Sequence, residues 1–256
     1  MSCHIRSTDG TPISWSAEGT GPAVVVIDPI MVDRRLSPNG PLEAELASAF
    51  TVIRYDRRGK GDSACEGPIT PDSEIADLRA VINAASPDAP PAVYGLSSGG
   101  SLGLLASGRG VPMSALVVME PPSNPPDVET VIARTETLVA NGHNVEAVRE
   151  FYVYQGMPED VINHMTDFAE ACAPYAGTIP VDLRIAELLT PEILAQINAP
   201  VLAVASEASP PQLREFSEFV GSHAPTSEVR TLAGDWHGVP DDVLGTAVTE
   251  FISAVR

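Results

Sequence analysis

The stretch that most constrains this chain runs from Ala92 to Gly100 and reads Ala-Val-Tyr-Gly-Leu-Ser-Ser-Gly-Gly. A short apolar run leads into leucines at helical spacing through a turn of the form Gly-x-Ser-x-Gly. A serine on so tight a turn has a strained backbone, and glycines on either side prevent clashes with the strand and the helix. The serine hydroxyl is then exposed at a helix N-terminus, where backbone N–H groups can stabilise an oxyanion.

Strand and helix patterns alternate on both sides of this turn. A turn signal at residues 7–11 predicts a hairpin near the N-terminus. Apolar runs typical of buried strands lie at 23–27, 51–56, 115–120, 200–205 and 227–232. Helical apolar spacing lies at 42–50, 75–82, 210–221 and 240–255, and Thr70-Pro71 predicts a capped helix start. The alternation predicts an α/β fold with a mostly parallel, doubly wound sheet.

The strand pattern stops at a proline-rich segment, residues 121–126. Only helical patterns follow as far as residue 195, at 128–138, 145–154, 161–172 and 185–189. We therefore predict a core formed by residues 1–120 and 196–256 and a helical cap formed by residues 121–195.

Composition restricts the partners and the compartment. The net charge of −19 argues against nucleic acid and anionic membranes, because both repel an acidic surface. The three cysteines, Cys3, Cys65 and Cys172, lack metal-binding spacing and are typical of free thiols in a reducing compartment. No signal peptide or membrane-length apolar run is evident, so we expect a cytoplasmic protein. The sequence leaves the oligomeric state open, with a homodimer as one option.

Three segments together resemble the α/β-hydrolase superfamily over nearly the whole chain. They are the Gly-x-Ser-x-Gly turn at 95–99, which matches the family's nucleophile elbow, the Asp-x-Arg-Gly-x-Gly-x-Ser turn at 56–63, and Gly-Asp-Trp-His-Gly at 234–238. The Ser-Ser-Gly elbow and a glutamate after the next strand loosely resemble lactone hydrolases. The resemblance implies an α/β-hydrolase fold with an inserted helical cap and no metal or organic cofactor.

The residue types predict a catalytic triad. Ser97 needs a base to accept its proton, and the base needs a carboxylate to orient it. His237 lies between the last strand and the last helix, where this fold requires the base. We expect Glu120, at the end of the strand after the elbow, to be the acid, with Glu207 as the alternative.

The chain departs from the family pattern in two places. Asp28-Pro29 replaces the usual His-Gly, and Pro29 has no N–H to donate. Ser209 occupies the usual position of the catalytic aspartate. We expect the oxyanion-hole donors to be the N–H groups of Ser98 and Ile30. The residues expected to contact the substrate are Asp28, Met31, Tyr154, Met157 and Trp236, although Asp28 could instead cap its own loop.

These features predict a serine hydrolase that cleaves a small or medium apolar ester or lactone through an acyl-enzyme. Two alternatives keep the fold. One is a non-hydrolytic enzyme that catalyses a cyclisation, isomerisation or elimination in a biosynthetic pathway. The other is a catalytically silent ligand-binding protein.

Overall fold

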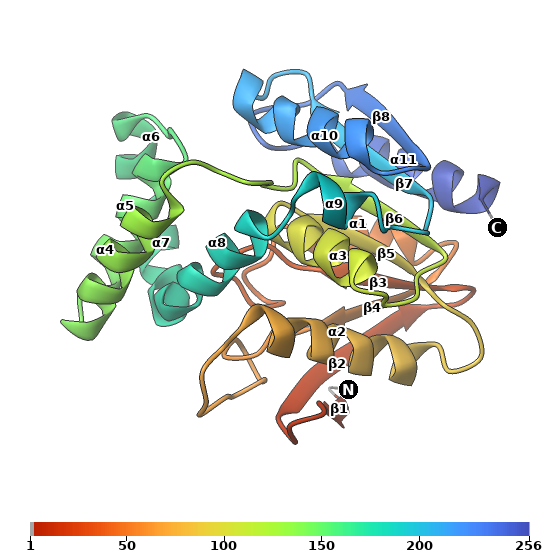
Figure 1. Cartoon of the computed structure of the whole chain (residues 1–256), viewed down its shortest axis with the longest axis horizontal. Helices are drawn as coiled ribbons and strands as arrows, with labels where there is room; N and C mark the ends of the chain where they lie inside the picture. The colour runs from red at the N-terminus through yellow and green to blue at the C-terminus, as the bar shows by residue number, and fades with distance from the viewer. Residues whose placement is uncertain (1–2, 256) are drawn as a thin grey trace.

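The computed structural model describes residues 3–255 and is built on one eight-stranded sheet (Figure 1). The strand order is β1-β2-β4-β3-β5-β6-β7-β8, antiparallel between β1, β2 and β4 and parallel from β4 to β8. The strands are β1 (Cys3–Arg6), β2 (Pro12–Gly19), β3 (Ala23–Ile27), β4 (Thr51–Tyr55), β5 (Ala92–Leu96), β6 (Ala115–Met119), β7 (Val201–Ser206) and β8 (Ser227–Leu232). The predicted α/β class and the N-terminal hairpin are confirmed.

Both faces of the sheet are covered by helices, which explains the continuous apolar strands. In β3, Val25 and Ile27 pack into the core on one face, while Val24 and Val26 pack into the core on the other. The first core is shared with α2 (Pro71–Ala85), α3 (Ser98–Gly108), α9 (Pro191–Leu194) and α10 (Pro211–His223). The second core is shared with α1 (Gly40–Leu46) and α11 (Asp241–Ala254). Because side chains alternate along a strand, both faces of β3 must be apolar.

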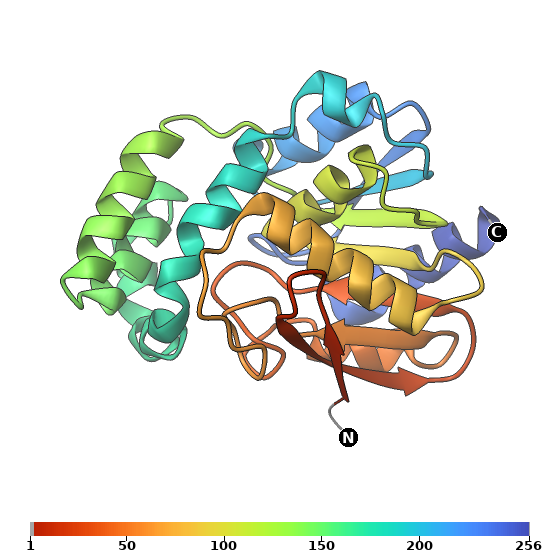
Figure 2. The ribbon, with the colours of Figure 1, turned by 60° about the horizontal axis from the view of Figure 1, so that its bottom comes forward.

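The predicted helical segment forms a third apolar cluster beside the sheet. It contains α4 (Val128–Ala140), α5 (Asn144–Tyr154), α6 (Glu159–His164), α7 (Thr166–Cys172), the 3₁₀ turn η1 (Ala173–Thr178) and α8 (Ile179–Glu187). Figures 1 and 2 show α4–α7 gathered at one end of the sheet, with α8 running back to the core. Ile179 and Leu183 of α8 pack into this cluster, whereas Val181 and Ile185 pack into the main core. Helix α8 therefore packs against both the main core and the cluster formed by α4–α7. The domain boundaries at residues 121 and 195 stay a prediction.

Local sequence signals explain the starts of helices α2 and α8. Helix α2 begins with the expected cap, because the Ser73 N–H donates to Thr70 Oγ1 at 3.2 Å and the Thr70 N–H donates to Ser73 Oγ at 2.9 Å. Helix α8 begins at Ile179, six residues before the apolar pattern at 185–189. Proline in its first turn allows this early start, since the N–H of that position has no helical acceptor.

A buried ion-pair network joins the turn after β4 to α2 and α8. Two nitrogens of the Arg57 side chain, Nε and Nη2, donate to Glu74 of α2 at 3.1 and 3.0 Å. Arg57 NH1 donates to Asp182 Oδ1 of α8 at 2.7 Å. Burial opposes the charge on Asp182, but Arg57 and Lys60 outweigh it and lower the pKa of the carboxyl group. This network fixes α8 to the core.

Within residues 3–255, no helix has both the length and the apolar composition needed to cross a bilayer.

Candidate active site

Ser97 lies on a strained turn between β5 and α3. Its backbone has φ 52° and ψ −124°, and its N–H donates to the Met119 carbonyl of β6 at 2.9 Å. A Cβ on Gly95 would lie 2.5 Å from Gly100 N, and a Cβ on Gly99 would lie 2.3 Å from Ile27 O. The glycines are therefore required because strand, turn and helix approach one another at backbone contact. This arrangement has the backbone geometry that the expected nucleophile elbow requires.

Glu120 and His237 form a hydrogen-bonded pair, although each comes from a different strand end. His237 Nδ1 lies 2.6 Å from Glu120 Oε2. Glu120 follows β6 and is fully buried, while the His237 side chain is 20% exposed. Both residues also have positive φ, 43° for Glu120 and 51° for His237. Three strained backbones thus belong to the three predicted triad residues, a concentration typical of active sites.

The surroundings of Glu120 favour its ionised form. Burial disfavours the charge, but hydrogen bonds from His237, the Ser206 N–H and Ser209 outweigh burial and lower the pKa of Glu120. The Ser206 N–H donates to Glu120 Oε1 at 2.8 Å. An ionised carboxylate can only accept, so His237 Nδ1 is the donor, and Nε2 is left unprotonated in the neutral ring.

The loop that carries His237 is held from two sides. Ser206 Oγ donates to the Asp235 carbonyl at 2.6 Å, and the His237 N–H donates to Ser209 Oγ at 2.9 Å. Ser209, in the position where the family usually has its aspartate, therefore supports both members of the Glu120–His237 pair. Sequence reasoning noted the replacement but did not anticipate this role. The alternative acid, Glu207, is exposed on the loop that follows β7, two residues before Ser209.

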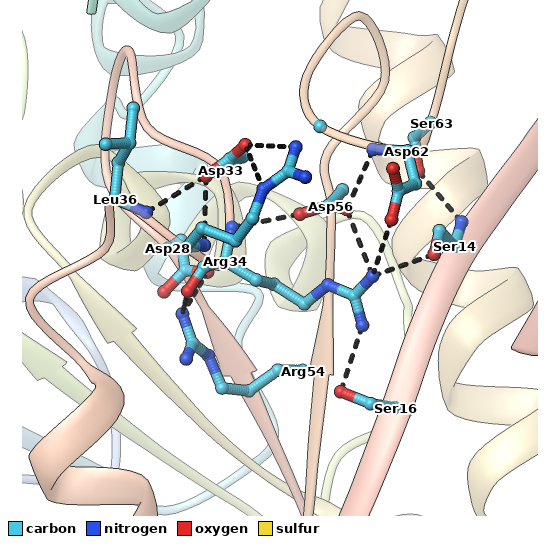
Figure 3. Close-up of polar contacts among 12 residues, drawn as sticks. Ser14, Ser16, Asp28, Asp33, Arg34, Leu36, Arg54, Asp56, Asp62 and Ser63 are labelled. Carbon is cyan, nitrogen blue, oxygen red and sulfur yellow. Dashed lines mark hydrogen bonds and ion pairs between the residues drawn. The ribbon is translucent and has the colours of Figure 1, made fainter. Parts of the chain in front are cut away.

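Asp28 is a buried loop anchor. Its carboxylate accepts hydrogen bonds from Ser37 Oγ, from Asn39 Nδ2 at 2.9 Å and from Arg54 Nη2 at 2.8 Å. Figure 3 shows the Arg54 guanidinium beside Asp28. With these partners the carboxylate is satisfied, and Asp28 is not among the residues that line the cavity described below. Asp28 therefore lies away from the cavity, and the structure does not support the expected contact between Asp28 and a substrate. Asp28 stabilises the loop after β3.

Arg34 anchors the far end of the same loop. Figure 3 shows its guanidinium between Asp56 and the serines of β2. Arg34 NH2 lies 3.1 Å from Asp56 Oδ2 and 2.8 Å from Ser14 Oγ, while the Arg34 N–H donates to Asp56 Oδ1 at 2.9 Å. Both ends of the loop after β3 are thus held by hydrogen bonds, although this chain lacks the His-Gly that the family usually has there. Between these anchors lies Met31, whose φ of 59° marks a tight turn.

The two expected oxyanion donors have available N–H groups. Ser98 is the first residue of α3, so its N–H has no acceptor within the helix. Among residues 3–255, no hydrogen bond uses the backbone N–H of Ser98 or of Ile30. Both residues line the same cavity as Ser97.

A cavity of about 850 Å³ lies between helices α5, α7 and α8 and the carboxyl ends of the strands. It is lined by Ser97 and His237 and by aromatic and aliphatic side chains such as Phe151, Phe216 and Leu183. Of the residues expected to contact a substrate, Met31, Tyr154, Met157 and Trp236 line it. The Trp236 ring lies edge-on to the His237 ring, with centroids 5.6 Å apart. Apolar walls around a few polar groups are typical of small-molecule sites.

In the part of the chain that the structure describes, no group of three or more His, Cys, Asp or Glu side chains has the arrangement of a metal site.

The family model for the alpha/beta hydrolase family matches residues 34–246. The chain belongs to this family. A solved alpha/beta hydrolase from Sphaerobacter thermophilus DSM 20745 is 33% identical, with a TM-score of 0.87 over 97% of this chain and 99% of that one. No curated protein matched the chain.

Two more distant members of the fold show its range. A thermophilic esterase from Thermogutta terrifontis is 20% identical, with a TM-score of 0.81 over 100% of this chain and 99% of that one. The enol-lactonase from Burkholderia xenovorans LB400 is 15% identical, with a TM-score of 0.77 over 98% of this chain and all of that one. At these identities the likeness establishes the hydrolase fold alone.

Proposed function

We propose that this member of the alpha/beta hydrolase family is a serine esterase or lactonase with a Ser97–His237–Glu120 triad. The observation that carries the proposal is the hydrogen bond between His237 Nδ1 and the buried carboxylate of Glu120, beside the cavity that Ser97 also lines. The esterase and enol-lactonase neighbours support an ester or lactone substrate. The apolar cavity walls support a substrate that is largely apolar.

In the first half of the reaction, Ser97 Oγ attacks the substrate carbonyl while His237 Nε2 takes its proton. Glu120 stabilises the imidazolium that forms, and the N–H groups of Ser98 and Ile30 stabilise the oxyanion. The C–O bond to the alcohol then breaks, and the alcohol oxygen takes the proton from Nε2. An ester releases its alcohol, whereas a lactone opens and keeps its hydroxyl on the acyl chain.

In the second half, His237 Nε2 takes a proton from water, and the hydroxide adds to the acyl carbon. The bond to Ser97 Oγ breaks, Oγ recovers the proton, and the carboxylic acid leaves. Protein groups that lie in or beside the cavity perform every step.

Labelling with a fluorophosphonate probe tests the nucleophile. We expect rapid modification of the parent at Ser97, no labelling of Ser97→Ala and a loss of at least a hundredfold in His237→Ala. Ser101→Ala is the matched control, because Ser101 lies in α3, the helix that follows Ser97, and its hydroxyl donates to the Pro122 carbonyl. A folded parent that binds small apolar esters but is never labelled would contradict the proposal and favour non-hydrolytic chemistry or ligand binding.

A further inference from the structure

Strand β8 forms an open edge of the sheet. It is the last strand in the order and, within residues 3–255, pairs only with β7, in parallel and without a bulge (Figure 1). The N–H groups of Val201 and Glu207 donate to the carbonyls of Thr226 and Leu232, both at 2.8 Å. Because the direction of the backbone groups alternates along a strand, the even-numbered residues of β8 bond to β7. The odd-numbered residues therefore direct their N–H and C=O groups to the free edge.

Strand β8 lacks the proline, lysine and bulge by which many edge strands avoid pairing. Its outward residues are Ser227, Val229 and Thr231. Val229, at the centre, is 41% exposed, and Thr231 is exposed as well. The opposite edge strand, β1, has only four residues, a length that itself limits pairing. Of the two edges of this sheet, β8 is therefore the one better able to accept another strand.

The sequence of β8 is self-complementary about Val229. Residues 227–231 read Ser-Glu-Val-Arg-Thr, with opposite charges on either side of the valine and hydroxyl residues beyond them. If two β8 strands pair antiparallel with Val229 on the two-fold axis, Glu228 of each copy faces Arg230 of the other. The hydroxyl residues then also face each other, and the outward N–H and C=O groups of residues 227–231 are paired. Opposite charges on facing residues stabilise an antiparallel pair.

The neighbouring registers oppose like charges. Only a two-fold axis that passes through a residue places odd-numbered residues opposite each other, which the outward backbone groups require. An axis at residue 228 would place Glu228 opposite Glu228 of the second copy, and an axis at residue 230 would do the same with Arg230. Like charges on facing residues destabilise the pair. Charge therefore selects the register with its axis at Val229.

The same two charges are already paired within each strand. Arg230 donates through Nε and Nη2 to Glu228, and its Nη1 lies 3.7 Å from Glu250 of α11. The Glu228 side chain is 48% exposed and the Arg230 side chain 28% exposed, so both are accessible to a second strand. The net charge of −19 repels a second copy in general. The charges of β8 itself cancel, so a second copy can contact this edge without adding to that repulsion.

We propose that the chain forms a two-fold homodimer in which the β8 strands of two copies pair antiparallel about Val229 and join the two sheets into one. The interface is isologous, as in most soluble homodimers, because each copy contributes the same residues. A single strand pair gives a small interface, so we expect a dissociation constant on the order of 10–100 µM. Strands β6 and β7 separate β8 from β5, which leads to Ser97, so the dimer does not depend on the proposed catalytic function.

Sedimentation velocity of the full chain, from about 1 to 500 µM, measures the dissociation constant of the dimer. Val229→Pro removes an outward N–H and no bond to β7, at a position where edge strands tolerate proline. We expect the dissociation constant to rise about tenfold or more in Val229→Pro and in Arg230→Glu, which places glutamates opposite each other. The charge-swapped variant Glu228→Arg/Arg230→Glu should return to within about threefold of the parent, because each arginine again faces a glutamate. Arg134→Glu is the matched control, because it alters an exposed ion pair on α4, and it should leave the constant unchanged.

Disulfide cross-linking tests the register. In a Cys3→Ser/Cys65→Ser background, Val229→Cys places two thiols on the axis, with Cα atoms about 5.5 Å apart, a separation typical of disulfides. Thr231→Cys is the control, because its two copies would lie about 13 Å apart along the paired strands. Mild oxidation should link Val229→Cys into a covalent dimer and leave Thr231→Cys monomeric on a denaturing gel.

Three outcomes would overturn the proposal. One is a parent that stays monomeric at about 500 µM. Another is a dimer that neither Val229→Pro nor Arg230→Glu weakens, which would place the contact on a different surface. The third is cross-linking of Thr231→Cys as fast as that of Val229→Cys. Circular dichroism checks that each variant is folded, and should Val229→Pro not fold, Arg230→Glu and the charge-swapped variant decide the question.

Discussion

His237 Nδ1 lies 2.6 Å from Glu120 Oε2, although the two residues are 117 positions apart in the chain. Glu120 stands at the end of β6 and His237 in the loop after β8, so β7 lies between their strands in the sheet. Parallel strands end at the same edge of the sheet, and ligands of such folds bind there. The acid and the base therefore meet because both follow strands that end at that edge.

This pair predicts that Glu120 is the acid of the triad. Glu120→Gln should lower kcat/KM for an ester such as ethyl butyrate by roughly 10³–10⁴-fold, since an amide cannot stabilise the imidazolium and can hold the ring in the wrong tautomer. Glu207→Gln is the matched control, because Glu207 is an exposed glutamate on the loop beside the site, and it should stay within about twofold of the parent. The opposite pattern would make Glu207 the acid.

The same carboxylate predicts a pH dependence of stability. The pKa of Glu120 in the folded protein is below its ordinary value of 4.5. Its charge therefore stabilises the fold fully above about pH 4.5, and this contribution is lost as the pH falls through the lower folded pKa. Urea unfolding should show Glu120→Gln less stable than the parent at pH 7, with a difference that shrinks below pH 4.5. A difference that stays constant down to pH 3 would refute a lowered pKa, and Glu207→Gln should show no such trend.

The elbow predicts that Gly99 tolerates no side chain. In Gly99→Ala the new Cβ would lie 2.3 Å from Ile27 O and 2.9 Å from Asp28 O, and backbone atoms cannot move aside cheaply. We expect a loss of about 2 kcal/mol or more in the free energy of unfolding, together with most of the activity. Gly177→Ala, in η1 with only an ordinary 3.9 Å contact between its Cβ position and Val139, should be neutral or slightly stabilising. Thermal unfolding followed by circular dichroism compares the two.

The buried network predicts that Arg57 is a major contributor to stability. Arg57→Met would leave Glu74 and Asp182 buried without their guanidinium partner, and we expect a loss of about 3–5 kcal/mol. Arg35→Met removes an exposed arginine, 71% accessible and paired with Asp33, and should leave the free energy of unfolding close to that of the parent. Urea unfolding at pH 7 measures both. Equal losses would show that burial of the Arg57 pairs contributes nothing beyond an exposed ion pair.

The sequence alone determined the parts of the site that depend on local geometry. The glycines around Ser97 are needed within a span of five residues, and the backbone contacts at Gly95 and Gly99 confirm that reasoning. The apolar runs of β3 to β7 and the capped start of α2 are likewise local, so the α/β class could be predicted. Glu120 and Glu207 both follow strands, so the strand pattern alone left both open as the acid. The preference for Glu120 came from the family resemblance, and it agrees with the hydrogen bond to His237.

Only the tertiary structure decided which side chains share a space. Asp28 follows a strand just as Glu120 does, but Arg54, Asn39 and Ser37 occupy its carboxylate, and it lies outside the cavity. Asp182 was not singled out in the sequence, because a single aspartate on a cap helix resembles a solvated surface charge. The packing of α8 against the core buries it beside Ser98 and Arg57. Periodicity shows which face of a helix is apolar, whereas the partner that this face meets depends on how the whole chain packs.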